Sequence, residues 1–481
     1  MIYDFYYKHR KLLIIILLVI LPSVILGLIN TAAPILACGL ILMVASILFV
    51  MMHPKVGLIC FSLFLIFQYI IVYLIGGNYG ALLDKFDEIY IGLFFIIIIV
   101  TRLINGEKLR FQPVGYFFIS LTIIGFLSSY LSNLTNISAI IGQFLLTAKG
   151  LIVFYTFYNI DYQESDITVL FKYVNIVGIF ITITVLFNIA FPETFTNAVG
   201  GVKYYRMGFI NPVSVFGHPG GLGNFMSLIL CFPIALYLSS KNKYNNLITV
   251  IIFILVMMST MRVMSVFALT VTLLIILFYV NSAERKRVTA LLLLLIIPGI
   301  AFVSDMMVKV LGSYFIKYDP SKIARNVLYL TSFKISEDYF PFGSGFGTFG
   351  GWMSRVYYSP LYYKYGLNTV WGLSPKYGSF INDTFWPHIL AELGIFGFIM
   401  YAMIFVVFIK YSIKGMNNFY SPIMRCFSLV CFMIVISSLV LSIKATIYEM
   451  SLFAYIIFGS LGILCSCMRN KKYIIERRVK F

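Results

Sequence analysis

Three arginines and one lysine occupy positions in this sequence where a fixed positive charge is costly. Arg206, Arg262 and Arg325 lie close to the ends of apolar segments, and Lys149 lies inside one. An ionised side chain at membrane depth costs about 2.5–3.5 kcal/mol on insertion scales, so each needs a compensating partner. A guanidinium carries a planar fork of donors that fits phosphate oxygens, so several arginines facing one space would bind a pyrophosphate. The alternative is that each cation extends to lipid headgroups.

Two carboxylates follow near the C-terminal third of the chain. Asp383 precedes an apolar run that begins near residue 385, with Pro387 in the first turn, where proline is tolerated. Asp383 is therefore predicted either to cap a helix or to accept a proton from a substrate hydroxyl. Glu392 lies about two turns deeper, where a carboxylate requires a partner. We expect Glu392 to pair with an arginine or with Lys149, in a structural salt bridge or in catalysis.

Tyrosine and tryptophan are concentrated between residues 352 and 377. Aromatic faces pack on sugar rings and tyrosine hydroxyls bond to sugar hydroxyls, so Tyr358 and Tyr363 are candidates for substrate binding. The alternative is an aromatic belt at the membrane surface. The glycine-rich stretch 343–351 has no strand before it and no Lys-Ser or Lys-Thr after it, so the nucleotide-binding interpretation is weak. We expect these glycines to permit a tight turn against the membrane surface.

The elements that position these residues are predicted to be membrane helices. The chain has 481 residues, of which 61% are hydrophobic and 11% charged, whereas soluble domains carry about 25% charged residues. A membrane helix needs about 20 mainly apolar residues. Candidate spans fall at 12–30, 33–52, 56–76, 88–104, 114–132, 138–158, 167–192, 221–239, 246–261, 264–281, 288–304, 386–409, 424–443 and 447–467.

These spans predict an all-α, polytopic integral membrane protein with about 12–14 transmembrane helices in a single transmembrane domain over 1–481. The break at Met261 and Arg262 fits either a turn between two spans or a polar interruption of one. The net charge of +18 does not indicate a nucleic-acid partner, because the basic residues lie at the edges of the apolar spans. No histidine or cysteine cluster has metal-ligand spacing, so we expect no metal and no cofactor.

The distribution of lysine and arginine predicts which loops are cytoplasmic, because basic residues are retained on that side. With the N-terminus inside, most basic residues fall in cytoplasmic segments, and both termini are cytoplasmic. The segment 159–166 is an exception because it is acidic. Two polar segments then lie outside: a large extracytoplasmic loop at 305–385 and a smaller one at 193–220. A loop of this size is expected to be functional and partly folded.

Several pieces of the sequence between about 200 and 400 together resemble the O-antigen polymerase and O-antigen ligase superfamily of bacterial envelope glycosyltransferases. The resemblance rests on their order and on the long loop between them. The pieces are Arg206-Met-Gly-Phe with His218-Pro-Gly-Gly-Leu-Gly, then Met261-Arg262-Val-Met-Ser, then Arg325-Asn-Val-Leu with Asp338-Tyr-Phe-Pro-Phe-Gly-Ser-Gly-Phe-Gly-Thr-Phe, and finally Asn382-Asp-Thr-Phe through Ala391-Glu-Leu-Gly-Ile-Phe-Gly397.

The resemblance implies an inverting glycosyltransferase of the bacterial cytoplasmic (inner) membrane that uses a glycan linked to polyprenyl pyrophosphate. It implies that Arg206 and Arg262 hold the pyrophosphate, with Arg325 as a further candidate, and it adds His218 to the substrate-binding candidates. Ligases of this superfamily carry a histidine where this chain has Asp383. An acid there resembles a polymerase, and it makes Asp383 the candidate proton acceptor. The implied partners are the lipid-linked oligosaccharide, membrane lipid, and chain-length regulator and flippase proteins.

The leading hypothesis is a polymerase of lipid-linked repeat units for O-antigen, capsule or exopolysaccharide. The alternatives are an O-antigen ligase and a lipid-linked oligosaccharide flippase. Transporters tend to have repeated halves and binding residues near the middle of the membrane. Here the polar residues gather in one large outer loop, which favours an enzyme, whereas Lys149 is the feature that best fits a flippase.

Overall fold

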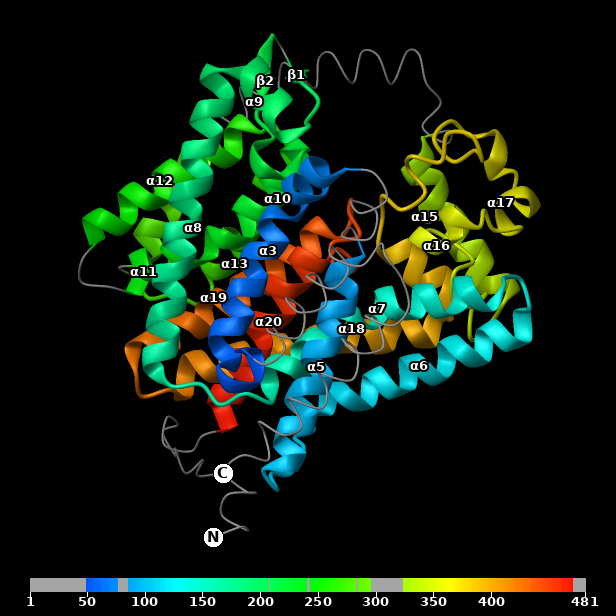
Figure 1. The fold of residues 1–481 in the computed structure, drawn as a ribbon, viewed down its shortest axis with the longest axis horizontal. Coiled ribbons are helices and arrows are strands. Elements are labelled where there is room, and N and C mark those ends of the chain that lie inside the picture. The colour runs from blue at the N-terminus through cyan, green and yellow to red at the C-terminus, as the bar shows by residue number, and fades with distance from the viewer. Residues whose placement is uncertain are drawn as a thin grey trace, which may run out of the picture.

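The computed structural model describes residues 49–76, 85–206, 208–239, 243–282, 284–295 and 323–469. Within these ranges the chain is mostly helical (Figure 1). Eight of the described helices are long and apolar enough to cross a membrane, which confirms a polytopic membrane protein. The predicted spans 12–30 and most of 33–52, and the end of 288–304, lie outside the described residues.

The long apolar helices agree closely with the predicted spans, and proline stands in the first turn of most of them, where its missing N–H is no loss. Their bounds are α3 (Pro54–Ile75), α6 (Pro113–Ser132), α7 (Ile137–Tyr158), α8 (Glu164–Ala190), α10 and α11 (Pro219–Ile229 and Cys231–Ser239), α18 (Trp386–Asn418), α19 (Pro422–Leu441) and α20 (Ser451–Arg469).

Three further helices of the described residues belong to the apolar bundle. They are α5 (Phe86–Ile104), which carries charges near both ends, and the shorter α12 (Lys243–Ser259) and α13 (Val263–Ile276). Residues 284–295 are also helical. The break at Met261 and Arg262 is a turn between two helices: Met261 adopts a positive φ of 52° and Arg262 is the extended N-cap of α13.

The smaller predicted loop is folded. It contains α9 (Pro192–Val199), the antiparallel strands β1 (Tyr204–Arg206) and β2 (Phe209–Asn211), and the 3-10 helix η1 (Ser214–Phe216). The two strands form a hairpin in which Arg206 pairs with Phe209. The strands and α9 lie together at the top of Figure 1. Arg206 is therefore held on a hairpin at one end of the bundle.

The described part of the large predicted loop, residues 323–385, is also folded. It contains α15 (Ala324–Asp338), α16 (Trp352–Val356), α17 (Leu361–Lys364) and the 3-10 helix η3 (Leu367–Thr369). These elements share a second hydrophobic core, separate from the main one, that includes Leu328, Phe349 and Tyr362. Residues 305–322 lie outside the described residues.

The glycine-rich stretch makes tight turns, as predicted, with a positive φ at Gly343, Gly345, Gly347 and Gly350, and it is buried among helices. Gly343 has a φ of +81°, and a Cβ there would lie 2.3 Å from the backbone nitrogen of Gly394. The backbone of α18 is non-helical at Gly394. The N–H groups of Ser344 and Gly345 donate to the carbonyl oxygens of Ala391 and Glu392, at 2.9 and 2.8 Å. The glycine-rich stretch thus supplies backbone partners where α18 is interrupted.

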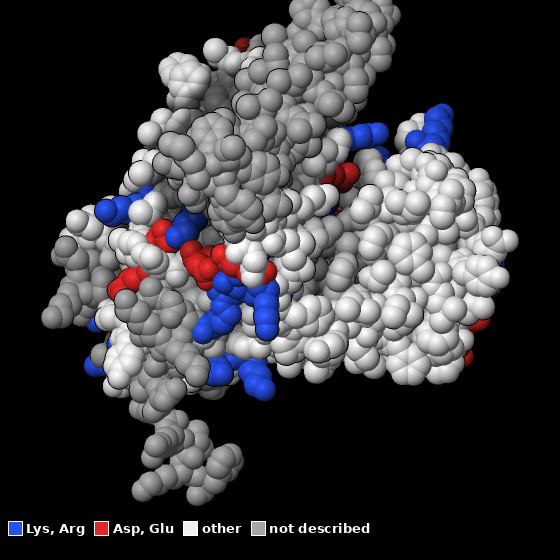
Figure 2. Space-filling view, turned by 60° about the horizontal axis from the view of Figure 1, so that its bottom comes forward, with Lys and Arg blue, Asp and Glu red and all other residues white. Residues whose placement is uncertain are grey.

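Acidic and basic side chains gather on one face at the opposite end of the bundle (Figure 2). Asp161 is bonded to Arg110 at 2.9 Å and to Arg469, and Asp166 is bonded to Lys55 at 2.5 Å. All of these residues come from segments predicted to be cytoplasmic. The acidic segment 159–166, which was the exception to the basic pattern, is therefore the counter-charge to basic residues at the same end.

Candidate functional site

Three arginines from separate parts of the sequence gather at one end of the bundle. Arg206 at the end of β1 donates from Nη1 to the carbonyl oxygen of Met261 at 2.8 Å, which places it beside Arg262. Nη2 of Arg262 lies 3.1 Å from Nε2 of His218, the N-cap residue of α10. Two short loops thus converge through three side chains.

Arg325 and Asp383 form the other half of the same site. In the first turn of α15, Nη2 of Arg325 donates to Oδ2 of Asp383 at 2.6 Å. Burial and then the neighbouring Arg206 lower the pKa of Arg262, and Arg325 contributes in the same direction while Tyr204 opposes. Arg325 therefore lies within electrostatic reach of Arg262. We call Arg206, Arg262, Arg325, His218 and Asp383 the arginine cluster.

The arginine cluster has an excess of positive charge and unused donors. It holds three guanidinium groups against one carboxylate. Nε of Arg262 and Nε of Arg325 are both buried, and among the described residues neither has a hydrogen-bond partner. The side chain of Arg325 is 43% exposed and that of Asp383 28% exposed, so the cluster is open to solvent. This arrangement suits an anion with several oxygen acceptors.

His218 connects α10 to the cluster. Its Nδ1 accepts the N–H of Gly220 at 3.0 Å, as an N-cap. Partial burial and the charge of Arg262 lower its pKa, and Asp383 opposes this effect, which favours the neutral ring near pH 7. Nε2 lies 3.1 Å from Nη2 of Arg262, and because a guanidinium can only donate, this hydrogen bond requires Nε2 to be the acceptor. His218 therefore orients the Arg262 guanidinium within the cluster.

Asp383 does not cap a helix, so that alternative is wrong. α18 begins at Trp386 with Pro387 in its first turn, as predicted, but its N-cap is Phe385 and no side chain caps it. Asp383 lies two residues earlier and is bonded to Arg325 instead. Arg325 contacts only Oδ2, and among the described residues no donor contacts Oδ1. One carboxylate oxygen is therefore available to accept a proton.

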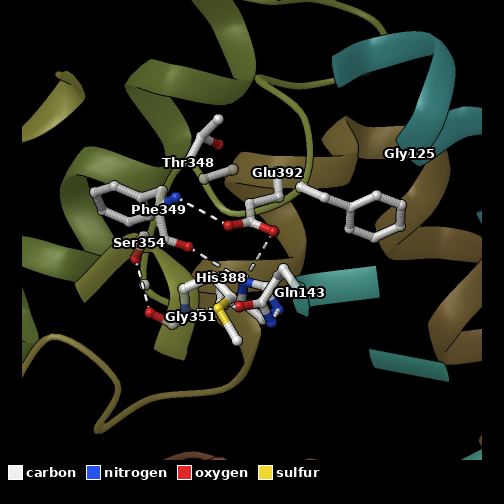
Figure 3. A network of polar contacts seen from close by, with 12 residues as sticks. Gly125, Gln143, Thr348, Phe349, Gly351, Ser354, His388 and Glu392 are labelled. Carbon is white, nitrogen blue, oxygen red and sulfur yellow. Dashed lines mark hydrogen bonds and ion pairs between the residues drawn. The ribbon is translucent and has the colours of Figure 1, made fainter. Parts of the chain in front are cut away.

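Glu392 belongs to a separate, buried polar network rather than to the arginine cluster (Figure 3). Its Oε1 accepts the N–H of Phe349 at 3.0 Å, and its Oε2 lies 3.4 Å from Nδ1 of His388, one helical turn away. Nε2 of His388 lies 3.0 Å from Glu449. Glu392 is fully buried and bonds neither an arginine nor Lys149 among the described residues, so its expected partners were wrong.

Lys149 lies in the same network at its other end. Its ammonium group donates to Glu88 at 3.0 Å, to the carbonyl oxygen of Glu449 at 2.9 Å and to Ser451 at 3.0 Å. Gln143 joins the two ends, because its Nε2 donates to Glu449 at 2.8 Å and its Oε1 accepts the N–H of Met353 at 3.2 Å. Lys149 is therefore internally compensated and does not reach the arginine cluster.

The sequence interpretation overlooked Glu449, Gln143 and Glu88. Glu449 and Glu88 each stood near the start of a predicted apolar span, at 447–467 and 88–104. An acid inside such a span requires a partner, and this was the available signal. Glu392 and His388 are four residues apart, which places them on one face of a helix and could also have been recognised.

The tyrosine-rich run is folded onto the second core, with some rings buried and others exposed. Tyr358 packs on Tyr362 with ring centroids 5.1 Å apart, and its hydroxyl donates to the carbonyl oxygen of Leu373 at 2.9 Å. Burial raises its pKa to about 12. Tyr363 is 57% exposed and packs edge-on against Tyr358 at 5.3 Å. Tyr358 is thus an anchor, and Tyr363 is free to contact a ligand.

Comparison of the chain with protein-family models and with curated protein sequences finds no match.

Proposed function

We propose that this protein is a polymerase of lipid-linked oligosaccharide repeat units in a bacterial cytoplasmic membrane. It would act as an inverting glycosyltransferase that transfers glycan from polyprenyl pyrophosphate to a hydroxyl at the non-reducing end of another repeat unit. The observation that carries the proposal is the arginine cluster, in which three guanidinium groups and one carboxylate from four separate segments converge at one end of the apolar bundle.

The proposed reaction divides the roles within the cluster. The acceptor hydroxyl attacks the anomeric carbon, a new glycosidic C–O bond forms, and the C–O bond to the pyrophosphate breaks. Oδ1 of Asp383 takes the hydroxyl proton. The leaving polyprenyl pyrophosphate takes the bonding electron pair, and Arg206, Arg262 and Arg325 offset its developing charge. Attack opposite the leaving group inverts the anomeric centre.

The buried Nε donors of Arg262 and Arg325, which have no partner among the described residues, support a polyanionic leaving group. A pyrophosphate has several acceptor oxygens, and charge-assisted hydrogen bonds to phosphate are among the strongest in proteins. A single carboxylate ligand would leave most of these donors unsatisfied. The donor set therefore fits a pyrophosphate better than it fits a monoanion.

An apolar cavity of about 360 Å³ can hold part of the lipid carrier. It is bounded by α3, α8, α10 and α20 and is lined mainly by aliphatic and aromatic side chains, including Phe225 and Ile229. Phe225 is two helical turns from His218 on α10, a rise of about 10 Å. The lining also includes Lys55 and Asp166 at the opposite end of the bundle, so the cavity extends from Phe225 away from the arginine cluster.

The proposal is tested with the purified protein in proteoliposomes supplied with lipid-linked repeat units of the host strain. Polymer ladders are resolved on gels, alongside surface polysaccharide from a deletion strain. We expect polymer from the wild type and none from Arg206→Ala or Arg262→Ala, and single repeat units on the surface of the deletion strain. Long polymer left on the lipid carrier in the deletion strain would indicate a ligase instead. Full-length polymer from both arginine variants would refute the arginine role.

A second candidate is a lipid-linked oligosaccharide flippase, and the buried polar network favours it. Lys149, Glu449, His388 and Glu392 are all at least nine-tenths buried. Ionisable groups at membrane depth often mark transport or proton pathways. In this case the deletion strain would accumulate single lipid-linked units on the cytoplasmic face, and the purified protein would move them across vesicles without lengthening them.

A further inference from the structure

We propose that the folded segment 323–385 carries a binding surface for an acidic glycan, namely one whose sugars bear carboxylates. This inference rests on the proposed function and adds the chemical class of the substrate to it. We call this surface the aromatic surface. It consists of Tyr363, Trp371, Tyr377, Arg355 and Lys376, with Tyr358 as its anchor.

Exposed aromatic rings provide the first part of the argument. Trp371 is 76% exposed, and Tyr363 and Tyr377 are each 57% exposed. These large rings are not packed in the protein core, whereas other rings of the same segment, Tyr362 and Phe349, are fully buried. The exposed rings stand on a rigid support, because Tyr358 is bonded to the 371–377 turn through the carbonyl oxygen of Leu373.

Two cations without an ion-pair partner among the described residues, Lys376 and Arg355, lie over aromatic rings. Nζ of Lys376 is 5.3 Å from the ring centroid of Tyr377, and the guanidinium of Arg355 is 5.2 Å from that of Trp352. Among the described residues neither cation has an ion-pair partner. The third cation of this region, Lys364, differs because it is bonded to Asp338 at 3.2 Å. Residues 339–382 contain no aspartate or glutamate. The aromatic surface is therefore positive, with no carboxylate of its own.

A chain of contacts joins the aromatic surface to the arginine cluster. Trp371 packs edge-on against Phe380, with ring centroids 5.2 Å apart, and the guanidinium of Arg325 lies 5.8 Å from the Phe380 ring. Arg325 in turn holds Asp383. A glycan whose end reaches Asp383 would therefore extend over Phe380 and Trp371.

This combination fits an acidic sugar chain better than it fits a neutral one. Sugar C–H faces pack on aromatic rings, and a carboxylate on the same sugar would bind Lys376 or Arg355. A neutral glycan would use the rings but leave both cations without partners. The competing explanation is contact with anionic lipid headgroups. We favour the glycan because the contacts lead directly to Asp383, which a membrane surface does not explain.

The test measures glycan binding by the full-length protein in nanodiscs of neutral phospholipid, with polymerisation absent. The probes are oligogalacturonate and a maltooligosaccharide of the same length. We expect binding of oligogalacturonate that weakens with added salt, and at least tenfold weaker binding of the neutral probe. Lys376→Gln should weaken oligogalacturonate binding by up to about fivefold and leave binding of the neutral probe unchanged, because a solvent-exposed ion pair contributes about 0–1 kcal/mol. Trp371→Ala should weaken both probes.

Matched controls come from the opposite end of the molecule. Lys414→Gln and Tyr420→Ala replace an exposed lysine and an exposed tyrosine outside the aromatic surface, and both should bind as the wild type does. Equal binding of the two probes would overturn the preference for an acidic glycan. No binding of either probe would overturn the surface itself.

A separate measurement detects the membrane explanation. If Trp371 lies in the lipid surface, brominated lipids in the nanodisc will quench more fluorescence in the wild type than in Trp371→Phe, and the proposal will be wrong. We expect equal quenching of the two. Because binding is measured without turnover, these results are independent of the polymerisation assay. A protein that binds acidic glycan but forms no polymer would refute the polymerase and retain the glycan surface.

Discussion

Replacing Asp383 with asparagine should abolish turnover while leaving the protein folded. Asparagine keeps the size of the side chain and an oxygen that can accept from Arg325, but it cannot take a proton from the acceptor hydroxyl. The perturbation therefore separates the proposed chemical role from the observed structural one. The structural role is small, because both partners are partly exposed, with 43% of the Arg325 side chain and 28% of the Asp383 side chain open to solvent.

The two effects differ greatly in size. A solvent-exposed ion pair contributes about 0–1 kcal/mol to stability, and at this chain length that shifts the unfolding midpoint by about 2 °C or less. A positioned general base contributes about 10²–10⁴-fold to rate, equivalent to roughly 3–5 kcal/mol of activation free energy. Asp383→Asn should therefore retain its thermal midpoint and lose at least 99% of its turnover.

The assay pairs polymer formation in proteoliposomes with thermal unfolding in detergent. The matched control is Glu193→Gln, which removes another surface carboxylate bonded to a cation at 2.6 Å, on α9 and outside the arginine cluster. The control should retain wild-type turnover. If Asp383→Asn retains more than about a tenth of wild-type turnover, Asp383 is not the proton acceptor. If its turnover and its midpoint both fall sharply, the residue is structural.

Two further predictions concern the backbone and His218. Gly343→Ala should prevent folding, because at a φ of +81° its Cβ would lie 2.3 Å from the backbone of Gly394. The control is Gly366→Ala, which has a φ of +70° but no neighbouring atoms, and it should lower the free energy of unfolding by about 1–2 kcal/mol. Thermal unfolding measures both variants. His218→Ala should lose about 1 kcal/mol of stability because the N-cap of α10 is removed, whereas His218→Asn keeps a capping oxygen. Both variants should lose turnover, because both remove the contact between Nε2 and Arg262. Because the folded pKa of His218 lies below its unfolded value of about 6.5, the unfolded chain binds the proton first as pH falls. Stability should therefore decrease between pH 6.5 and the folded pKa in the wild type, and His218→Asn should remove that part of the decrease.

Hydropathy was enough to predict the membrane helices, because a long apolar segment can satisfy its backbone only as a helix. The start of α18 and the proline in its first turn were also predictable, since both depend on neighbouring residues. The partner of Asp383 was not, because Arg325 is distant in sequence and only the packing of α15 against α18 brings them together. The same is true of Glu449, which lies in the turn before α20 and meets His388 of α18.

The buried polar network explains how a site assembled from distant segments can be held in register. α18 is interrupted at Gly394, and amides of the glycine-rich stretch satisfy the carbonyls at that interruption. Glu392 of α18 then holds Phe349, and Gln143 of α7 holds Met353 of α16, so the stretch and the helix that follows it are fastened to α18 and α7. α15, which carries Arg325, directly precedes this stretch, and Asp383 directly precedes α18. The network therefore fixes the two elements that set the distance between Arg325 and Asp383. The buried charges of the network thus have a positioning role in the polymerase proposal, whereas the flippase proposal places them on the transport path.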